Sequence, residues 1–150
     1  MIALLQRVLA ASVVVGGETV GAIGPGLLIL LGIEKGDHEG RARRLASRVA
    51  RYRCFPGEKG RPMDRSLLDT GGGALVVSQF TLCADTSKGL RPGFDRAAPP
   101  DEAEPLVEVF RRGLAEAGVG EVRTGRFRSH MLVNLTNEGP VTLRLTDRRD

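Results

Sequence analysis

The most apolar run in the sequence reads LLILLGI and spans residues 27–33. Its successive side chains are apolar, so a strand formed here must be covered on both faces, as in the centre of a sheet. Shorter β-rich runs precede it, separated by glycine-containing turns: Ile2–Val8, Ser12–Val15 and Thr19–Ile23. The first third of the chain therefore predicts an antiparallel meander that leads into a central strand.

Two amphipathic segments predict helices. The first covers residues 39–52, with Asp37 as its expected N-cap and one apolar face. The second opens at Asp101, which together with Glu104 resembles a capping box, and stops at Gly118. Each helix needs a sheet to cover its apolar face.

The remaining segments supply more strands. Residues 54–70 predict a loop with one short strand near Leu67, and a glycine turn then leads into a strongly apolar strand over Ala74–Leu82. Alternating strands follow the second helix at residues 119–124, 131–137 and 141–145. No linker or repeat divides the chain, so residues 1–150 predict a single α+β domain of mainly antiparallel sheet with two helices.

The composition supports a compact globular chain. Its 150 residues are 41% hydrophobic and 27% charged. No apolar run approaches the ~18 residues of a transmembrane helix, and Gln6 and Arg7 interrupt the apolar amino terminus before a signal peptide could form. We therefore expect a cytoplasmic protein that does not enter a membrane.

Cysteine and charge usage narrow the function classes. Cys54 and Cys83 are isolated and only two histidines accompany them, so we expect neither a disulfide framework, a metal site nor a cofactor. The net charge of +4 is compatible with a polyanionic partner. One face of the first helix carries four arginines, which are either a phosphate-binding stripe or a solvated helix face: Arg41, Arg44, Arg48 and Arg51.

Two polar segments stand next to hydrophobic strands. The first, SQFTL at residues 78–82, places polar side chains where a core strand ought to be apolar. In a regular strand Ser78 and Thr81 point to opposite faces, so they act together only if the strand is interrupted. The second, NEGPVT at residues 137–142, is either an ordinary hairpin turn or a functional corner.

These two segments, in this order, resemble the signatures of the D-aminoacyl-tRNA deacylases. The resemblance extends to Gln6-Arg7-Val8, Lys88-Gly89-Leu90-Arg91-Pro92 and Thr124-Gly125-Arg126-Phe127. It implies a metal-free homodimer of barrel-like subunits that hydrolyses the ester joining a D-amino acid, or glycine, to the end of a tRNA. Arg128-Ser129 departs from the family pattern, which has small residues after Phe127.

The chemistry of the first segment must rely largely on the backbone. Neither segment contains His or Cys, and Glu138 is their only ionisable side chain. We expect the catalytic residues to be Ser78, Gln79, Phe80 and Thr81, with backbone N–H groups donating to the tetrahedral oxyanion. Thr81 is either a nucleophile or, as we favour, a water-orienting hydroxyl. The resemblance adds assistance by the terminal 2′-OH of the tRNA.

The second segment acquires a role through the resemblance. It implies a cis Gly139-Pro140 step that enters the active site of the partner subunit and excludes an L side chain by shape. Asn137 and Met131 are expected to join these residues in substrate binding and chiral selection.

Alternative functions remain open at this stage. A non-catalytic RNA-binding module would use the helix arginines together with Lys88 and Arg91, and a metal-dependent hydrolase is a more distant possibility. Whether the protein deacylates tRNA or only binds RNA, the residues expected to contact the nucleic acid are Lys88, Arg91, Arg44 and Arg48.

Overall fold

The structure, a computed structural model, describes residues 1–147. Strand β1 (Ile2–Val15) organises its sheet because it pairs antiparallel with three other strands. Its first half pairs with β3 (Gly26–Gly32), its second half with β2 (Glu18–Ile23), and both halves pair with β6 (Leu132–Thr146). The two strands predicted at residues 2–8 and 12–15 are therefore one, because pairing with β6 carries the backbone across the gap between them.

The sheet is mixed rather than purely antiparallel. Its order is β2-β1-β3-β4-β5, and the pairs of β3 with β4 (Gly73–Ser78) and of β4 with β5 (Val122–Thr124) are parallel. A helical crossover precedes β4 and another precedes β5, so each strand starts from the same end of the sheet. A Cβ on Gly21 of β2 would collide with the carbonyl oxygen of Thr124 on β5. The two ends of the sheet thus approach each other and nearly close a barrel.

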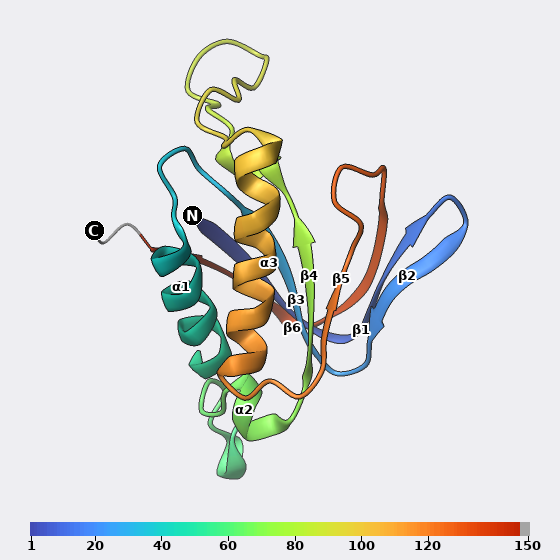
Figure 1. Cartoon of the computed structure of the whole chain (residues 1–150). Coiled ribbons are helices and arrows are strands. Elements are labelled where there is room, and N and C mark those ends of the chain that lie inside the picture. Colours follow the sequence, from blue (N-terminus) through green and yellow to red (C-terminus); the bar gives the residue numbers. More distant parts are fainter. Residues whose placement is uncertain (148–150) are drawn as a thin grey trace.

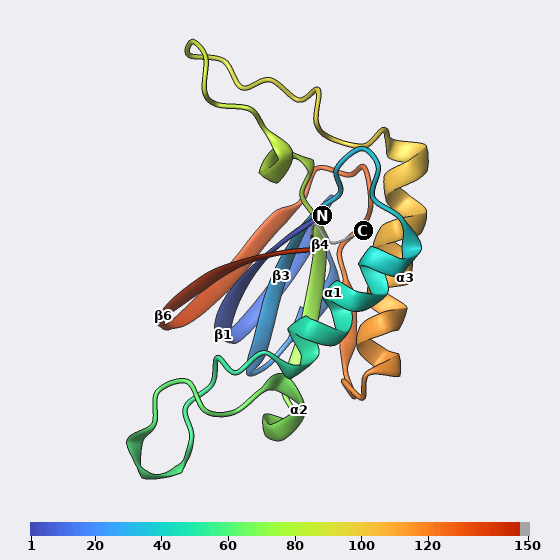
Figure 2. The same cartoon turned by 90° about the vertical axis from the view of Figure 1, so that its left-hand side faces the viewer.

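Helices α1 (Glu39–Arg51) and α3 (Pro100–Glu116) lie side by side over one face of the sheet, with β6 at the far side of the fold (Figures 1 and 2). They bury the predicted apolar faces, including Leu45 and Phe110, both 0% exposed. No helix within residues 1–147 is long and apolar enough to cross a membrane.

The structure confirms the predicted start of the first helix at Glu39 but corrects the predicted caps of both helices. The N-cap of α1 is His38, while the Asp37 carboxylate accepts hydrogen bonds from the Met1 ammonium at 2.8 Å and the Glu34 N–H at 2.8 Å. The N-cap of α3 is Pro99, without a side-chain capping bond, so Asp101 lies inside the first turn. Pro100, the first residue of α3, has no N–H, so no cap is needed for a donor at that position.

The central strand predicted at residues 27–33 is confirmed as β3. Leu27, Ile29 and Leu31 belong to the core beneath the helices, while Leu28 belongs to a second core on the other face of the sheet with Leu75. Successive side chains of this strand point to opposite faces of the sheet and pack into two different cores, which is why the run is apolar at successive positions.

The connection from α1 to β4 contains a 3-10 turn at Glu58–Gly60 and a short helix α2 (Leu67–Thr70) in place of the predicted strand near Leu67. Ser66 and Asp69 form a capping box, which explains why this segment is helical.

Candidate functional site

The SQFTL segment leaves the sheet instead of continuing it, so the strand predicted through Leu82 is wrong. Strand β4 ends at Ser78, and a 3-10 turn occupies Phe80–Cys83. The partner strand β3 ends at Gly32, where a Cβ would lie only 3.0 Å from the Cys83 Sγ and the Leu82 Cβ. The chain folds over this glycine, and strict alternation no longer separates Ser78 from Thr81.

The turn leaves two backbone donors available. The Gln79 N–H donates to the Leu31 carbonyl at 2.8 Å and is therefore occupied. The first N–H bonded within the turn is that of Leu82, which donates to the Gln79 carbonyl at 3.2 Å. The N–H groups of Phe80 and Thr81 precede it, so the turn itself does not use them.

Thr81 has an amide partner rather than a base. Its hydroxyl oxygen accepts a hydrogen bond from Gln79 Nε2, and both side chains lie next to the exposed ring of Phe80 in the chain. Within residues 1–147, no histidine, lysine or carboxylate hydrogen-bonds to this hydroxyl. An amide donor does not remove a proton, so this contact supplies the hydroxyl with no general base and leaves its own hydrogen for donation.

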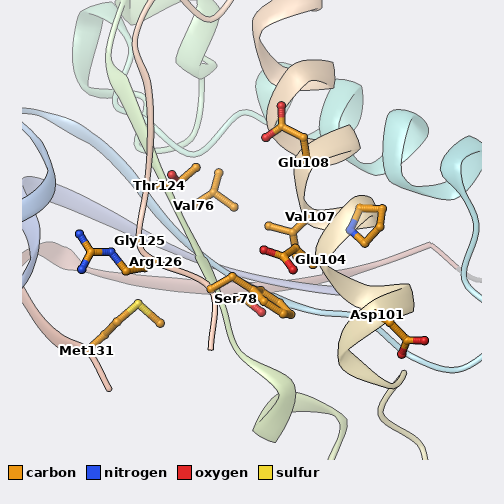
Figure 3. A pocket seen from close by; sticks show the side chains of 12 residues that line it. Val76, Ser78, Asp101, Glu104, Val107, Glu108, Thr124, Gly125, Arg126 and Met131 are labelled. Atoms are coloured by element: carbon orange, nitrogen blue, oxygen red, sulfur yellow. The ribbon is translucent and has the colours of Figure 1, made fainter. Parts of the chain in front are cut away.

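A cavity of about 670 Å³ opens between the segment after β4 and the loop between β5 and β6. Its lining includes Gln79, Phe80, Ala97, Ala98, Arg128 and Met131. A neighbouring cavity of about 630 Å³ lies between β4, β5 and the first half of α3. In Figure 3 its Ser78 lies between Met131 on one side and Glu104 of α3 on the other. Ser78 and Met131 line both cavities, so the structure brings together these predicted site residues from distant parts of the chain.

The NEGPVT segment is not a hairpin turn but an excursion within β6. Strand β1 pairs Gln6 with Thr142 and Val8 with Asn137, so four residues of β6 lie opposite the single residue Arg7. The Asn137 side chain closes the excursion: its Nδ2 donates to Thr142 Oγ1 at 3.1 Å, and its Oδ1 accepts from the N–H of Val141 at 2.9 Å. This network holds the segment as a defined corner.

Gly139 and Pro140 form the exposed tip of this corner. Their peptide bond is cis, and Gly139 has a φ of +130°, a backbone conformation that favours glycine. Neither cavity lined by Ser78 includes Gly139 or Pro140 of the same chain. The two sequence segments are thus both structured, but one protomer does not bring them together.

Arg7 holds the corner from the neighbouring strand, a role that our sequence analysis missed. Its side chain is buried; Nη1 donates to the Cys54 carbonyl at 2.8 Å, and Nε donates to the Glu138 carbonyl at 3.2 Å. Nε also lies 3.2 Å from the Glu138 carboxylate. An arginine inside the apolar first strand was the available signal, because a buried guanidinium requires nearby acceptors.

The basic residues predicted to bind tRNA fall into two groups. Lys88 and Arg91 are exposed on the 85–93 loop, which projects from one end of the fold, beyond the start of α3 (Figure 1). Arg44 Nε binds the Asp147 carboxylate at 2.9 Å, and Arg48 Nη1 donates to the Thr146 carbonyl at 3.1 Å. These two arginines therefore also attach α1 to the end of β6.

The 85–93 loop is itself well organised. Asp85 and Gly93 exchange backbone hydrogen bonds of 2.8 and 2.9 Å, which close the base of the loop. The Asp85 carboxylate accepts from the N–H and hydroxyl of Ser87, and these bonds lower the pKa of Asp85. Beyond the loop, the Phe94 ring meets the edge of the Phe80 ring at 5.0 Å between centroids. The loop is thereby connected to the SQFTL segment.

The described part of the chain offers no group of three or more His, Cys, Asp or Glu side chains that could hold a metal ion. Both cysteines are buried, and desolvation raises the pKa of Cys54 to about 11. The SQFTL segment itself offers hydroxyl, amide, backbone and aromatic groups, while charged or titratable side chains line the cavities beside it: Arg128 and His130 in one, and Asp101, Glu104, Glu108 and Arg126 in the other.

Known proteins are similar in sequence to nearly the whole chain. A family model described as D-Tyr-tRNA(Tyr) deacylase matches residues 4–146. A D-aminoacyl-tRNA deacylase of Xanthomonas axonopodis pv. citri (strain 306) is 57% identical over 145 residues, covering 97% of this chain and 99% of that protein. Another, of Roseiflexus sp. (strain RS-1), is 60% identical over 145 residues, covering 97% and 92%.

Solved structures show the same fold. The structure of the c-Myc DNA Unwinding Element Binding Protein has a TM-score of 0.93 at 36% identity and covers 99% of this chain and 100% of its own. A probable eukaryotic D-amino acid tRNA deacylase has a TM-score of 0.80 at 17% identity, with 96% and 97% covered. At that identity the second likeness concerns the fold alone.

Proposed function

Because the chain belongs to the D-aminoacyl-tRNA deacylase family and hydrolyses D-aminoacyl-tRNA, we propose that it acts as a homodimer whose active sites are shared. In this dimer, the Gly139-Pro140 corner of each protomer enters the cavity beside Ser78 of the other. The observation that carries the proposal is that the corner is held rigidly by Arg7 and Asn137 but is exposed and outside its own protomer's cavities.

The surface around β6 suits such a contact. Within residues 1–147, β6 pairs only with β1, so its other edge is available. Three leucines on these adjoining strands are exposed to 50%, 57% and 36%: Leu9, Leu132 and Leu135. Burial of leucine side chains stabilises an association by roughly 25 cal/mol per Å² of apolar surface. When a second copy covers these leucines with its own β6, the Gly139-Pro140 corner of that strand also lies at the contact between the two copies.

The proposed chemistry uses the two free donors of the 3-10 turn. The N–H groups of Phe80 and Thr81 donate to the oxyanion that forms when water attacks the ester carbonyl, each donor being typically worth about 3–4 kcal/mol. Thr81, whose hydroxyl already accepts from Gln79, orients the attacking water. The tRNA's terminal 2′-OH, next to the ester, completes proton transfer, since the described residues provide no base at the Thr81 hydroxyl.

The proposed selection against L-amino acids is steric. The backbone of Gly139 and Pro140 lies against the α-carbon of the bound amino acid and occupies the space that an L side chain would require. A D side chain points away, and glycine has none, so both D-aminoacyl-tRNA and glycyl-tRNA are admitted, including glycine mischarged on tRNA for alanine. The exposed Lys88 and Arg91 bind the phosphates of the tRNA. Because its substrate is aminoacylated tRNA, the enzyme acts in the cytoplasm.

Mixed dimers test the shared site. Phe80→Pro removes one proposed oxyanion donor at the first position of a 3-10 turn, where proline is sterically tolerated, and should lower kcat about 10²–10³-fold. Phe80→Ala keeps the N–H and is its control, with a much smaller loss. Gly139→Ala strains a backbone with a φ of +130° and would place a Cβ 2.7 Å from Val141 Cγ2. The displaced corner should obstruct the partner's cavity, so that the Gly139→Ala homodimer is inactive.

Equal amounts of Phe80→Pro and Gly139→Ala protein, unfolded and refolded together, should recover roughly a quarter of wild-type activity, because half the dimers are mixed and each has one intact site. The same variants refolded separately and then combined serve as the control. Mixtures no more active than their components would show that each site is built within one protomer.

A further inference from the structure

Arg128 occupies an unusual position at the mouth of the 670 Å³ cavity. It is exposed, lines that cavity and has a φ of +57°, in the left-handed region. The N–H of Ser129 donates to the Arg126 carbonyl at 3.3 Å and closes a tight turn around it. Such a turn favours glycine or asparagine at this position, so the arginine side chain is not explained by the backbone conformation.

The guanidinium of Arg128 is also unused. Within residues 1–147 it forms neither a hydrogen bond nor an ion pair, whereas the neighbouring Arg123 and Arg126 pair with Glu121 and Glu18. An arginine that is disfavoured by its backbone and unpaired in its own protein is available to an anion that enters from solvent.

Two segments that are distant in sequence line this cavity. Phe80, Ala97 and Ala98 lie between β4 and α3, whereas Arg128 lies in the loop between β5 and β6. The scissile ester is attached to the terminal ribose of the tRNA, and the same ribose bears the phosphodiester that joins it to the preceding nucleotide. A cation that lines the ester-binding cavity is therefore a candidate to bind the first phosphate of the strand that carries the ester.

We propose that Arg128 binds this terminal phosphodiester and so contributes to affinity for tRNA at the active site itself. The inference rests on the proposed function of the cavity. The planar guanidinium donates two parallel hydrogen bonds to the phosphate oxygens, a geometry that lysine cannot reproduce. Arg128 is a substrate-binding residue that orients the strand, while the reacting groups remain those of the SQFTL segment.

Glycine substitution separates this role from a structural one. Arg128→Gly removes the charge and also relieves the left-handed backbone, so the Tm should stay the same or rise. The KM for D-tyrosyl-tRNA should nevertheless rise roughly tenfold at low salt, with kcat little changed. Lys59 provides a matched control, because it is also a cationic residue with positive φ, +58°, in the segment at the opposite end of the fold. Lys59→Gly should leave the KM unchanged.

A substrate without phosphates completes the test. D-Tyrosyl-adenosine carries the same ester on the same ribose, so Arg128→Gly should hydrolyse it with the wild-type KM. Arg128→Lys keeps the charge but not the forked geometry, so its KM for D-tyrosyl-tRNA should lie between those of the wild type and Arg128→Gly. The slope of log KM against log salt should fall by about 0.7 in Arg128→Gly, as expected when one phosphate contact to a single strand is lost.

The outcomes are distinguishable. An unchanged KM for D-tyrosyl-tRNA in Arg128→Gly would overturn the assignment, and so would an equal loss on D-tyrosyl-adenosine, which would indicate a change in cavity shape. Failure of the wild-type protein to hydrolyse D-tyrosyl-adenosine or D-tyrosyl-tRNA would instead refute the proposed function of the cavity.

Discussion

Replacing Arg7 with methionine tests whether the corner of β6 depends on its buried guanidinium. Methionine is comparably long but apolar, so packing is largely retained while the hydrogen bonds are lost. The buried Cys54 carbonyl loses its 2.8 Å partner, at a cost of about 1–3 kcal/mol. The ion pair with Glu138, whose side chain is 40% exposed, adds no more than about 1 kcal/mol.

Removal of a desolvated charge offsets part of this loss. We therefore expect the free energy of unfolding, measured in urea, to fall by about 2–3 kcal/mol, and the Tm by about 5–10 °C. The kcat/KM ratio for D- over L-tyrosyl-tRNA should fall at least about tenfold, since loosening the corner by about 1.4 kcal/mol is sufficient. Activity on D-tyrosyl-tRNA should change less.

Arg144→Met is a suitable control, because it removes an exposed arginine from the same strand β6 beyond the corner. It should alter neither stability nor selectivity appreciably. If Arg7→Met were as stable and as D-selective as the wild type, the reasoning would be refuted, and the Asn137 network alone would suffice to hold the corner. Arg7→Lys keeps the charge without the forked geometry and should be intermediate.

Three further predictions concern other parts of the fold. Gly26→Ala should destabilise the protein by at least about 3 kcal/mol in urea, because the new Cβ would lie 2.7 Å from the Gly73 nitrogen and collide with its carbonyl oxygen. The Cys54 thiol should resist a disulfide reagent at pH 8 until the protein unfolds. Burial raises the pKa of the Cys54 thiol from 9.0 to about 11, so its contribution to stability should be present below pH 9 and lost as the pH rises towards 11. The decrease in the free energy of unfolding over this pH range should therefore be smaller in Cys54→Ala. The double variant Lys88→Ser, Arg91→Ser should raise the KM for D-tyrosyl-tRNA and weaken its salt dependence, whereas its kcat should be unchanged.

Local patterns in the sequence were sufficient for the elements that fold on one consistent periodicity. Strand β3 was predicted from its continuous apolar run, and the buried faces of α1 and α3 from their helical spacing. The SQFTL and NEGPVT segments were located because polar residues interrupt hydrophobic strands. The chemistry that we propose for them was inferred from the absence of His and Cys and from the resemblance to a known family.

Other features depended on partners that local patterns do not contain. The strand after Gly73 ends at Ser78 because its neighbour β3 ends at Gly32 and the chain folds over it. The expected caps of α1 and α3 failed because Asp37 binds the amino terminus and a proline starts α3.

The sequence by itself determined the central strand β3 and which faces of α1 and α3 are buried, and it located the two polar segments that we propose to be functional, since these follow from residue type and spacing along the chain. Only the tertiary structure decided that β6 runs unbroken past its corner and that Arg7 holds Glu138 across 131 residues of sequence. Such contacts form because burial leaves a guanidinium and a carbonyl no water to bind, and the fold alone selects which acceptor is near.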